Sequence, residues 1–350
     1  MKVQFGISLG SSVGLLGGAD TQKFMDLVKM ADGYGAAAIG TYDSAFLGGD
    51  AYVRATLMAL AAPRAQIGLR PSNPLTREPQ IMASFLASID TLTGGRAFLD
   101  IASGDSAVFN IGYPAATRAR IEDYVTCVRG LLARGESSYQ GRPQRVRWAS
   151  QVVRPSVPIS ICAEGPKMLH LGGRIGDGVI AGTGLLPEVV SDTIARIHAG
   201  AREAGREPSE VEVWFTARSS LHEDRDTAIQ NVKASVSSIL NHAMRFGLDG
   251  KHVPADLRAK IQDYVDGYEL YDHVLHGGRN PKRMADLGLT DYAIDRWALA
   301  GAPRDWITRI EQLAERGETR LWVGVNGADL DAQRHYLKMM GEEILPRFVG

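Results

Sequence analysis

The stretch that decides the fold begins RAQIGLRPSNPLTREPQ at residues 64–80 and ends TLTGGRAFLDIASGDS at residues 91–106. Apolar residues alternate in a short strand before Pro71. A helical spacing of apolar side chains follows over residues 78–92, and a pair of glycines ends it. Residues 96–102 form a second strand. The stretch therefore predicts a βαβ unit whose polar loops follow the strands, where parallel α/β folds bind ligands.

The same alternation of strands and helices continues along the 350 residues. The segments that resemble strands are 3–9, 36–40, 67–69, 96–102, 159–163, 178–181, 211–217 and 319–325. Helical patterns separate them, so the chain predicts a (β/α)8 (TIM) barrel as a single domain over residues 1–350. A doubly wound sheet is the alternative fold, but no G-x-G-x-x-G fingerprint follows the first strand.

The alternation of strands and helices is interrupted after the seventh predicted strand. Residues 227–246 and 257–268 have helical patterns, and a polar run follows at residues 271–278. No strand pattern separates these helices. We therefore expect a long, mainly helical insertion at about residues 222–292, which acts as a lid within the barrel domain.

Composition excludes several classes of protein. A net charge of -1 is too low for a general nucleic-acid binder. No apolar run approaches the roughly 20 residues of a membrane helix, and the N-terminus has no signal-peptide pattern. Cys127 and Cys162 cannot form a disulfide framework or a zinc knuckle, and both are expected to be buried thiols. We expect a cytoplasmic protein that binds neither nucleic acid nor membrane.

Small and polar residues follow five of the predicted strands. They are Thr41, Tyr42 and Asp43; Ser72 and Asn73; Gly104, Asp105 and Ser106; Glu164, Gly165, Pro166 and Lys167; and Gly182, Thr183 and Gly184. Such residues also make ordinary turns, which is the simpler explanation. The C-terminal ends of barrel strands converge on one pocket, however, and polar residues at five ends favour a binding site there.

The segment that begins at Glu164 is the candidate phosphate site. Gly165 lets an anion approach the backbone, and Pro166 suits the first position of a helix whose N-terminus supplies free N–H groups. Lys167 adds a positive charge. The residues that end the neighbouring strand, Gly182 to Gly184, would add donors to the same anion. An ordinary helix start is the alternative interpretation.

Other charged residues carry weaker signals. His273 and His276 lie three apart in the insertion near Asp272, but no third ligand accompanies them, so we favour a lid contribution to a substrate pocket over a metal site. Histidines at the surface without a role in the pocket are the remaining alternative. Arg77 and Arg96 look less catalytic. Arg96 precedes a strand, at the bottom of the barrel, where a structural ion pair is expected. No G-x-S-x-G, H-E-x-x-H or P-loop motif points to a hydrolase or kinase.

Three regions resemble the bacterial-luciferase-like superfamily of flavin- and deazaflavin-dependent oxidoreductases. They are the stretch quoted first, CAEGPKMLHLGGRIGDGVI at residues 162–180 and DRWALAGAP at residues 295–303. The likeness is greatest to the subgroup similar to methylenetetrahydromethanopterin reductase. It implies a (β/α)8 barrel with a long insertion after the seventh strand and a flavin-type ring across the C-terminal mouth.

The resemblance also implies roles for the strand ends. Ser72 and Asn73 would flank the ring, often with a non-proline cis peptide, and residues 104–106 would lie near the cofactor. Ala163 and the four residues that follow it, together with residues 182–184, would hold the phosphate.

Asp43 stands where many family members carry His or Glu. It is our candidate for proton transfer, and His273 and His276 join it from the lid.

Three functions remain open. The favoured one is a two-component monooxygenase that uses O2 and reduced FMN, supplied by a separate flavin reductase, on a small organic substrate. The second is a reductase or dehydrogenase that transfers a hydride with a deazaflavin, coenzyme F420. The third is a flavin-binding barrel without turnover. Because the family is often dimeric, we expect a homodimer or a higher homo-oligomer.

Overall fold

The computed structural model describes residues 2–9, 15–317, 319–327 and 329–349. Parallel strands close into a barrel because the last of them pairs with the first. In barrel order they are β1 (Gln4–Ser8), β2 (Ala38–Thr41), β3 (Gln66–Ser72), β4 (Ala97–Ile101), β7 (Ile159–Ala163), β8 (Gly178–Ala181), β9 (Glu212–Leu221) and β11 (Arg320–Gly324). The predicted (β/α)8 barrel is confirmed, with each strand where the sequence placed it.

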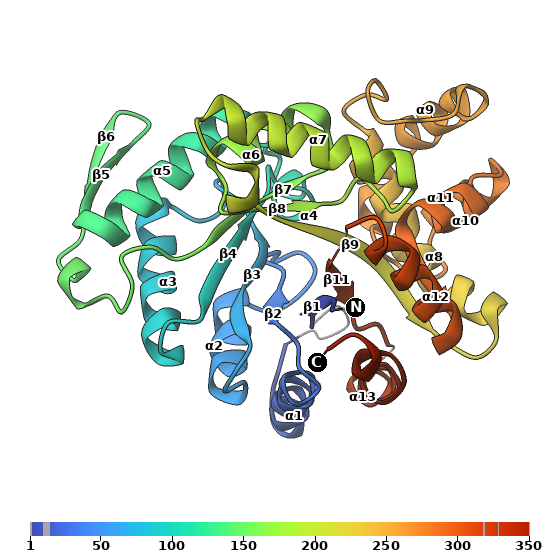
Figure 1. Cartoon of the computed structure of the whole chain (residues 1–350), viewed down its shortest axis with the longest axis horizontal. Coiled ribbons are helices and arrows are strands. Elements are labelled where there is room, and N and C mark those ends of the chain that lie inside the picture. The colour runs from blue at the N-terminus through green and yellow to red at the C-terminus, as the bar shows by residue number, and fades with distance from the viewer. Residues whose placement is uncertain (1, 10–14, 318, 328, 350) are drawn as a thin grey trace.

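Helices form the outer layer around the strands (Figure 1). They are α1 (Ala19–Gly33), α2 (Ala51–Ala61), α3 (Pro79–Thr93), α5 (Arg118–Arg134), α6 (Pro166–Ile175), α7 (Pro187–Glu203), α12 (Pro303–Ala314) and α13 (Leu330–Met339). Each turns an apolar stripe inward, as α3 does with Met82, Leu86 and Ile89. None of the described helices is long and apolar enough to cross a membrane. Cys127 and Cys162 are buried free thiols, as predicted.

Large side chains fill the interior of the barrel. The ring of Trp322 lies 5.6 Å from that of Trp214 and 5.8 Å from that of Phe98, measured between centroids. A facing glycine makes room for this packing, because a Cβ atom at Gly6 would lie 2.3 Å from the Trp322 ring. These aromatic rings form a packed floor beneath the C-terminal mouth.

The insertion after β9 is helical, with a small hydrophobic core of its own that includes Leu240, Tyr264 and Trp297. Its helices are α8 (Arg225–Met244), α9 (Arg258–Asp266), α10 (Arg279–Asp286) and α11 (Thr290–Trp297). A short strand, β10 (Ala298–Gly301), then pairs with the end of β9. The expected end of the insertion at residue 292 therefore falls inside α11.

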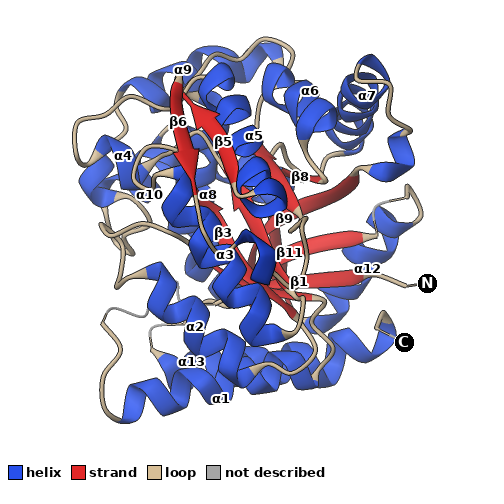
Figure 2. Cartoon of the chain, turned by 90° about the vertical axis from the view of Figure 1, so that its left-hand side faces the viewer, coloured by secondary structure: helices blue, strands red, loops and turns tan. Residues whose placement is uncertain are grey.

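Among the elements absent from the sequence prediction are β10, a hairpin and a single-turn helix. A hairpin of β5 (Glu136–Tyr139) and β6 (Arg142–Arg145) stands at one side of the barrel (Figure 2). A single-turn helix, α4 (Ser106–Phe109), follows β4.

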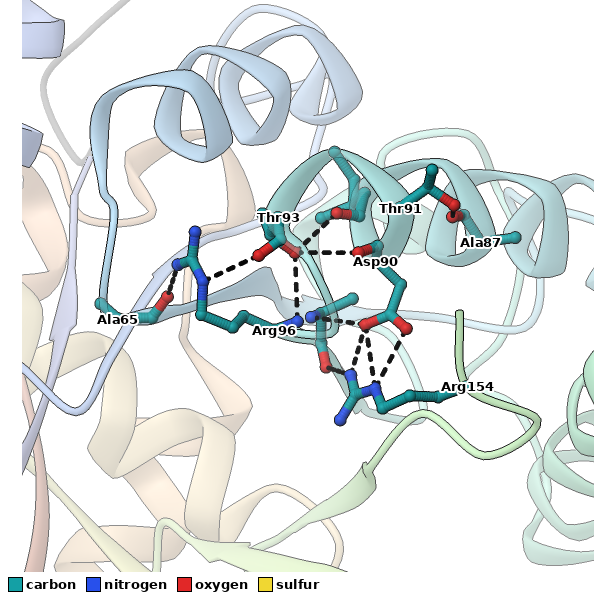
Figure 3. A network of polar contacts seen from close by, with 9 residues as sticks. Ala65, Ala87, Asp90, Thr91, Thr93, Arg96 and Arg154 are labelled. Carbon is teal, nitrogen blue, oxygen red and sulfur yellow. Dashed lines mark hydrogen bonds and ion pairs between the residues drawn. The ribbon is translucent and has the colours of Figure 1, made fainter. Parts of the chain in front are cut away.

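A buried ion pair ties helix α3 to the start of β4 (Figure 3). Asp90 is 1% exposed, and its carboxylate accepts hydrogen bonds from Arg154 Nε at 3.0 Å and from the Ala97 N–H at 3.0 Å. Arg154 also donates to the Ala97 carbonyl at 2.9 Å. The carboxylate is thus paired on several sides, as a buried charge requires.

The ion pair expected for Arg96 is not formed with any acid that the structure describes. This residue does lie at the N-terminal end of the barrel, but its guanidinium donates to the backbone carbonyls of Thr93 and Ala65 (Figure 3). The carboxylate of Asp90, at the same end of the barrel, is already paired with Arg154. Arg96 therefore closes a turn rather than neutralising a charge.

Replacing Asp90 by Ala should lower the free energy of unfolding by about 3 kcal/mol, because the Arg154 guanidinium would stay partly buried without its partner. Urea denaturation measures this loss. Asp331→Ala is the control, since Asp331 pairs with Lys23 at the surface with a 69% exposed side chain. It should cost about 1 kcal/mol or less. Equal losses in the two variants would contradict the structural role of Asp90.

Candidate active site at the barrel mouth

The five predicted strand ends share the C-terminal mouth of the barrel. The barrel topology places the residues after β2, β3, β4, β7 and β8 at this end. The insertion adds His242 and Arg245 from the end of α8, and neither was predicted from the sequence. Charged side chains from distant parts of the chain therefore meet here.

Asp43, the predicted proton-transfer residue, is held firmly by its neighbours. Its carboxylate accepts a hydrogen bond from Ser72 Oγ at 2.7 Å and pairs with Arg77 Nη2 at 3.2 Å. The Arg77 guanidinium also stacks on the Tyr52 ring, 4.3 Å from its centroid. These contacts join the loops after β2 and β3. They also occupy the Ser72 hydroxyl, which the sequence assigned to the cofactor.

Asn73 folds back on its own loop. Its Oδ1 atom accepts the N–H groups of Leu75 and Thr76, each at 3.0 Å, so the side chain forms a turn. A cis peptide bond precedes this loop, between Arg70 and Pro71. It differs from the non-proline cis peptide that the resemblance implied.

Asp105 is the centre of a charged cluster at the mouth. Arg245 donates to its Oδ1 atom. Its Oδ2 atom lies 3.8 Å from His242 Nε2 and 3.6 Å from His273 Nε2. Burial opposes ionisation, but the charges of His242 and Arg245 outweigh it and hold the pKa of Asp105 far below its usual range. Asp105 is therefore a carboxylate at neutral pH.

The residues beside Asp105 are closely packed. Gly104 has a φ of +101°, and a Cβ atom there would lie 2.6 Å from Val108. The Ser106 hydroxyl lies 3.2 Å from that of Ser44, which follows β2. Glycine is thus required at position 104 for both its conformation and its close contact.

Glu164 supplies a second carboxylate to the cluster. Its Oε1 atom lies 3.3 Å from His242 Nδ1, so both ring nitrogens of His242 face carboxylates, one after β4 and one after β7. Burial opposes ionisation of Glu164, yet His242 and Arg245 lower its pKa. Gly182 gives Glu164 its space, since a Cβ atom there would lie 2.9 Å from Glu164 Cγ.

His273 reaches the cluster from the insertion. Its side chain is 8% exposed, and burial lowers its pKa to about 4, so the ring is neutral at pH 7. Tyr268 Oη lies 2.8 Å from Nδ1, and burial raises the pKa of this phenol, which therefore donates its proton. The proton of His273 accordingly lies on Nε2, facing Asp105. His276, the other predicted lid histidine, is exposed and outside the cluster.

A small cleft lies at the N-terminus of α6, where the sequence placed a phosphate. It is lined by Glu164, Pro166, Leu169, Thr183, Val189, Asp192, Thr193, Gly250, Lys251, His252 and Arg296. Gly165 is the N-cap of this helix, and Ala163 is buried just before it. The predicted residues at the ends of β7 and β8 are thus brought together.

The charge of the cleft comes from the insertion rather than from Lys167, whose side chain is exposed and outside the lining. Lys251 takes its place, and its Nζ atom donates to the Ala243 carbonyl at 2.6 Å. Burial lowers the pKa of Lys251 to about 8. Arg296 packs against Gly184 and donates to backbone carbonyls, including that of Thr183 at 2.9 Å. Lys251 is therefore the cation best able to meet an anion there.

Beneath the cluster, charged side chains lie inside the barrel. Asp100 on β4 is 2% exposed, and burial raises its pKa from 3.8 to about 7 despite the opposing charge of Arg70 on β3. One of its oxygens, Oδ2, has no hydrogen-bond donor among the residues that the structure describes. The polar interior therefore extends below the mouth, toward the aromatic floor.

With this fold and site, the chain belongs to the luciferase-like monooxygenase family, whose sequence profile matches residues 1–320. It is an enzyme of the luciferase-like oxidoreductase kind. The predicted resemblance is confirmed. A flavin-binding barrel without turnover has no support from these relatives, which are named as enzymes.

Two curated relatives are similar to this chain over most of its length. The 5,10-methylenetetrahydromethanopterin reductase of Methanolobus tindarius is 28% identical over 303 residues, which cover 85% of this chain and 87% of that protein. The F420-dependent glucose-6-phosphate dehydrogenase of Nakamurella multipartita is 25% identical over 293 residues, covering 81% and 78%. These matches span most of both partners.

Solved structures share the fold. The coenzyme F420-dependent tetrahydromethanopterin reductase of Methanopyrus kandleri superposes with a TM-score of 0.78 at 24% identity, covering 99% of this chain and 100% of that one. The monooxygenase RslO1 of Streptomyces bottropensis has a TM-score of 0.70 at 20% identity, covering 98% and 99%. At these identities the superpositions show the common architecture alone.

Asp100→Asn should make stability less dependent on pH. Because its folded pKa of about 7 exceeds the ordinary 3.8, the folded state binds more protons than the unfolded state between these values. The stability that this group contributes is present below about pH 4 and is lost as pH rises through 7, by at most roughly 4 kcal/mol. At pH 8 the free energy of unfolding of the variant should therefore rise relative to that of the native protein.

Urea denaturation at pH 4, 6 and 8 measures the difference. Asp331→Asn, at the exposed surface, is the control and should show no such trend. A difference between Asp100→Asn and the native protein that stays constant over this pH range would contradict the raised pKa of Asp100.

Proposed function

We propose that the protein is a deazaflavin (coenzyme F420)-dependent reductase or dehydrogenase that transfers a hydride between this cofactor and a small organic substrate. Curated relatives of this kind align over most of the chain. The structural observation that carries the proposal is the charged cluster at the mouth, formed by Asp105, Glu164, His242, Arg245 and His273.

The cluster favours hydride transfer over oxygen activation. Oxygen chemistry on reduced FMN needs a pocket that keeps water away from the reacting ring. The mouth is lined by paired carboxylates, histidines and an arginine rather than by apolar side chains alone, and hydride transfer with a deazaflavin needs no such water-free pocket. The monooxygenase favoured by the sequence therefore has less support than its deazaflavin alternative. A separate flavin reductase is not required under this proposal, and the homodimer remains a prediction.

The residues at the mouth fit a flavin-type ring with a phosphate-bearing side chain. Residues 104–106 would flank the ring, and residues 163–166 with 182–184 would hold the phosphate at the start of α6. Lys251 would add the charge that the sequence assigned to Lys167. When bound, the cofactor supplies the hydride donor or acceptor.

The proton that accompanies a hydride transfer needs a carrier. His242 is the best-placed residue, because each of its ring nitrogens faces a carboxylate that can accept a hydrogen bond. His273, neutral and fixed by Tyr268, orients Asp105. Asp43 is committed to Arg77 and Ser72, and His276 lies away from the cluster, so the contacts support His242 ahead of both.

Deazaflavin should bind more tightly than FMN. Titration of the protein with each cofactor, in its oxidised and reduced forms and followed by fluorescence, should give a dissociation constant for the deazaflavin at least roughly 10-fold lower than that for FMN. Tight binding of reduced FMN alone, with oxygen uptake coupled to product formation, would restore the monooxygenase assignment.

Lys251→Met should weaken deazaflavin binding by roughly 10-fold, since the cofactor phosphate would lose a charge-assisted hydrogen bond. Lys167→Met is the matched control and should bind as the native protein does, because the Lys167 side chain lies outside the cleft. Thermal melts of both variants test that the fold is intact. If Lys167→Met alone weakened binding, the assignment of the phosphate to Lys251 would be wrong.

A further inference from the structure

Two arginines, Arg70 and Arg218, lie inside the barrel, just below the mouth. Arg70 is an inward-facing residue near the end of β3. Arg218 lies on the same face of β9 as the interior residue Trp214. No hydrogen bond or ion pair within 4 Å joins either guanidinium to a residue that the structure describes. The Nε atom of each is buried without an acceptor. Unpaired polar groups of this kind are rare in folded proteins.

The position of Arg70 is fixed by the aromatic floor. Its guanidinium lies over the Trp322 ring, 4.4 Å from the ring centroid. The Arg70 Cβ atom would lie 2.9 Å from a Cβ atom at Gly40, so glycine on the neighbouring strand is needed to admit this side chain. Arg70 is therefore preorganised by packing, and no ion pair within 4 Å joins it to an acid in the part of the chain that the structure describes.

The carboxylates nearby leave the two arginines with a surplus of positive charge. Asp105 is paired with Arg245, and Glu164 faces His242. The remaining acid, Asp100, has a pKa raised by burial to about 7. Burial lowers the pKa of both arginines. That of Arg218 falls to about 10, with the charge of Arg70 acting in the same direction, so Arg218 is still charged at pH 7.

We propose that Arg70 and Arg218 form a binding site for a planar, delocalised oxyanion at the floor of the mouth. Guanidinium groups bind such anions through paired, charge-assisted hydrogen bonds. The proposal rests on the proposed function for the source of the anion. The anion is either a carboxylate of the substrate or the negatively charged nitrogen–carbonyl edge of the reduced cofactor. Guanidinium groups would bind both in the same way.

The first arm of the test needs no cofactor. The full-length protein is titrated with benzoate at constant ionic strength, with chloride as the balancing anion, and tryptophan fluorescence is followed because Arg70 lies against Trp322. If the anion is a substrate carboxylate, the response saturates in the native protein. Arg218→Gln and Arg70→Gln then weaken it by at least roughly 10-fold.

Two further variants make this arm specific. Arg218→Lys keeps the charge without the planar pair of donors, so its affinity should fall between those of the native protein and Arg218→Gln. If a thermal melt shows that Arg218→Gln does not fold, Arg218→Lys is compared with the native protein in its place. Arg304→Gln, which alters an 87% exposed side chain, is the control and should respond as the native protein does.

The second arm compares deazaflavin binding in both redox states. If the anion belongs to the cofactor, Arg218→Gln weakens binding of the reduced form by at least roughly 10-fold more than binding of the oxidised form. If it belongs to the substrate, both forms bind unchanged and only the benzoate response is lost. Either result supports the site.

The proposal is overturned if the variants change neither the benzoate response nor the ratio of reduced to oxidised cofactor affinity. Failure of the proposed function looks different. In that case the native protein binds no deazaflavin, and the benzoate titration alone decides whether the arginine pair binds an oxyanion.

Discussion

The ion pair between Asp105 and Arg245 joins the barrel to its insertion. Asp105 follows β4, whereas Arg245 follows α8, 140 residues later in the chain. Their contact brings the end of α8 over the mouth, and His242, one turn earlier, then fits between Asp105 and Glu164. The charged cluster depends on this contact, and Lys251, six residues further along the chain, lines the cleft at the start of α6.

Local patterns were sufficient to predict the barrel. Ile67 and Leu69 alternate with inward-facing residues, and Gly94 adopts the left-handed conformation expected of a helix stop. The elements that were missed lack such signals. The hairpin of β5 and β6 is polar apart from Tyr139 and Pro143. Strand β10 follows Trp297 with no intervening turn, so it looked like a continuation of the insertion.

The residues of the candidate site also divide into those that could be predicted from the sequence and those that could not. The strand ends at residues 104–106 and 182–184 could be found, because barrel geometry brings them to one face. His242 and Lys251 could not, since nothing in a helical insertion shows which of its residues will meet a strand end far away in the chain. Alternation does carry a signal for Arg70, which occupies an inward position next to the outward-facing Leu69. A charge at such a position predicts a polar barrel interior.

The central claim is that this mouth holds a deazaflavin for hydride transfer. A crystal structure of the protein with oxidised coenzyme F420 tests it most directly. We expect the ring to lie across the mouth beside residues 104–106 and above Arg70 and Arg218, with the phosphate in the cleft at Lys251. A ring bound elsewhere, or a phosphate that contacts Lys167 and leaves this cleft empty, would contradict the account.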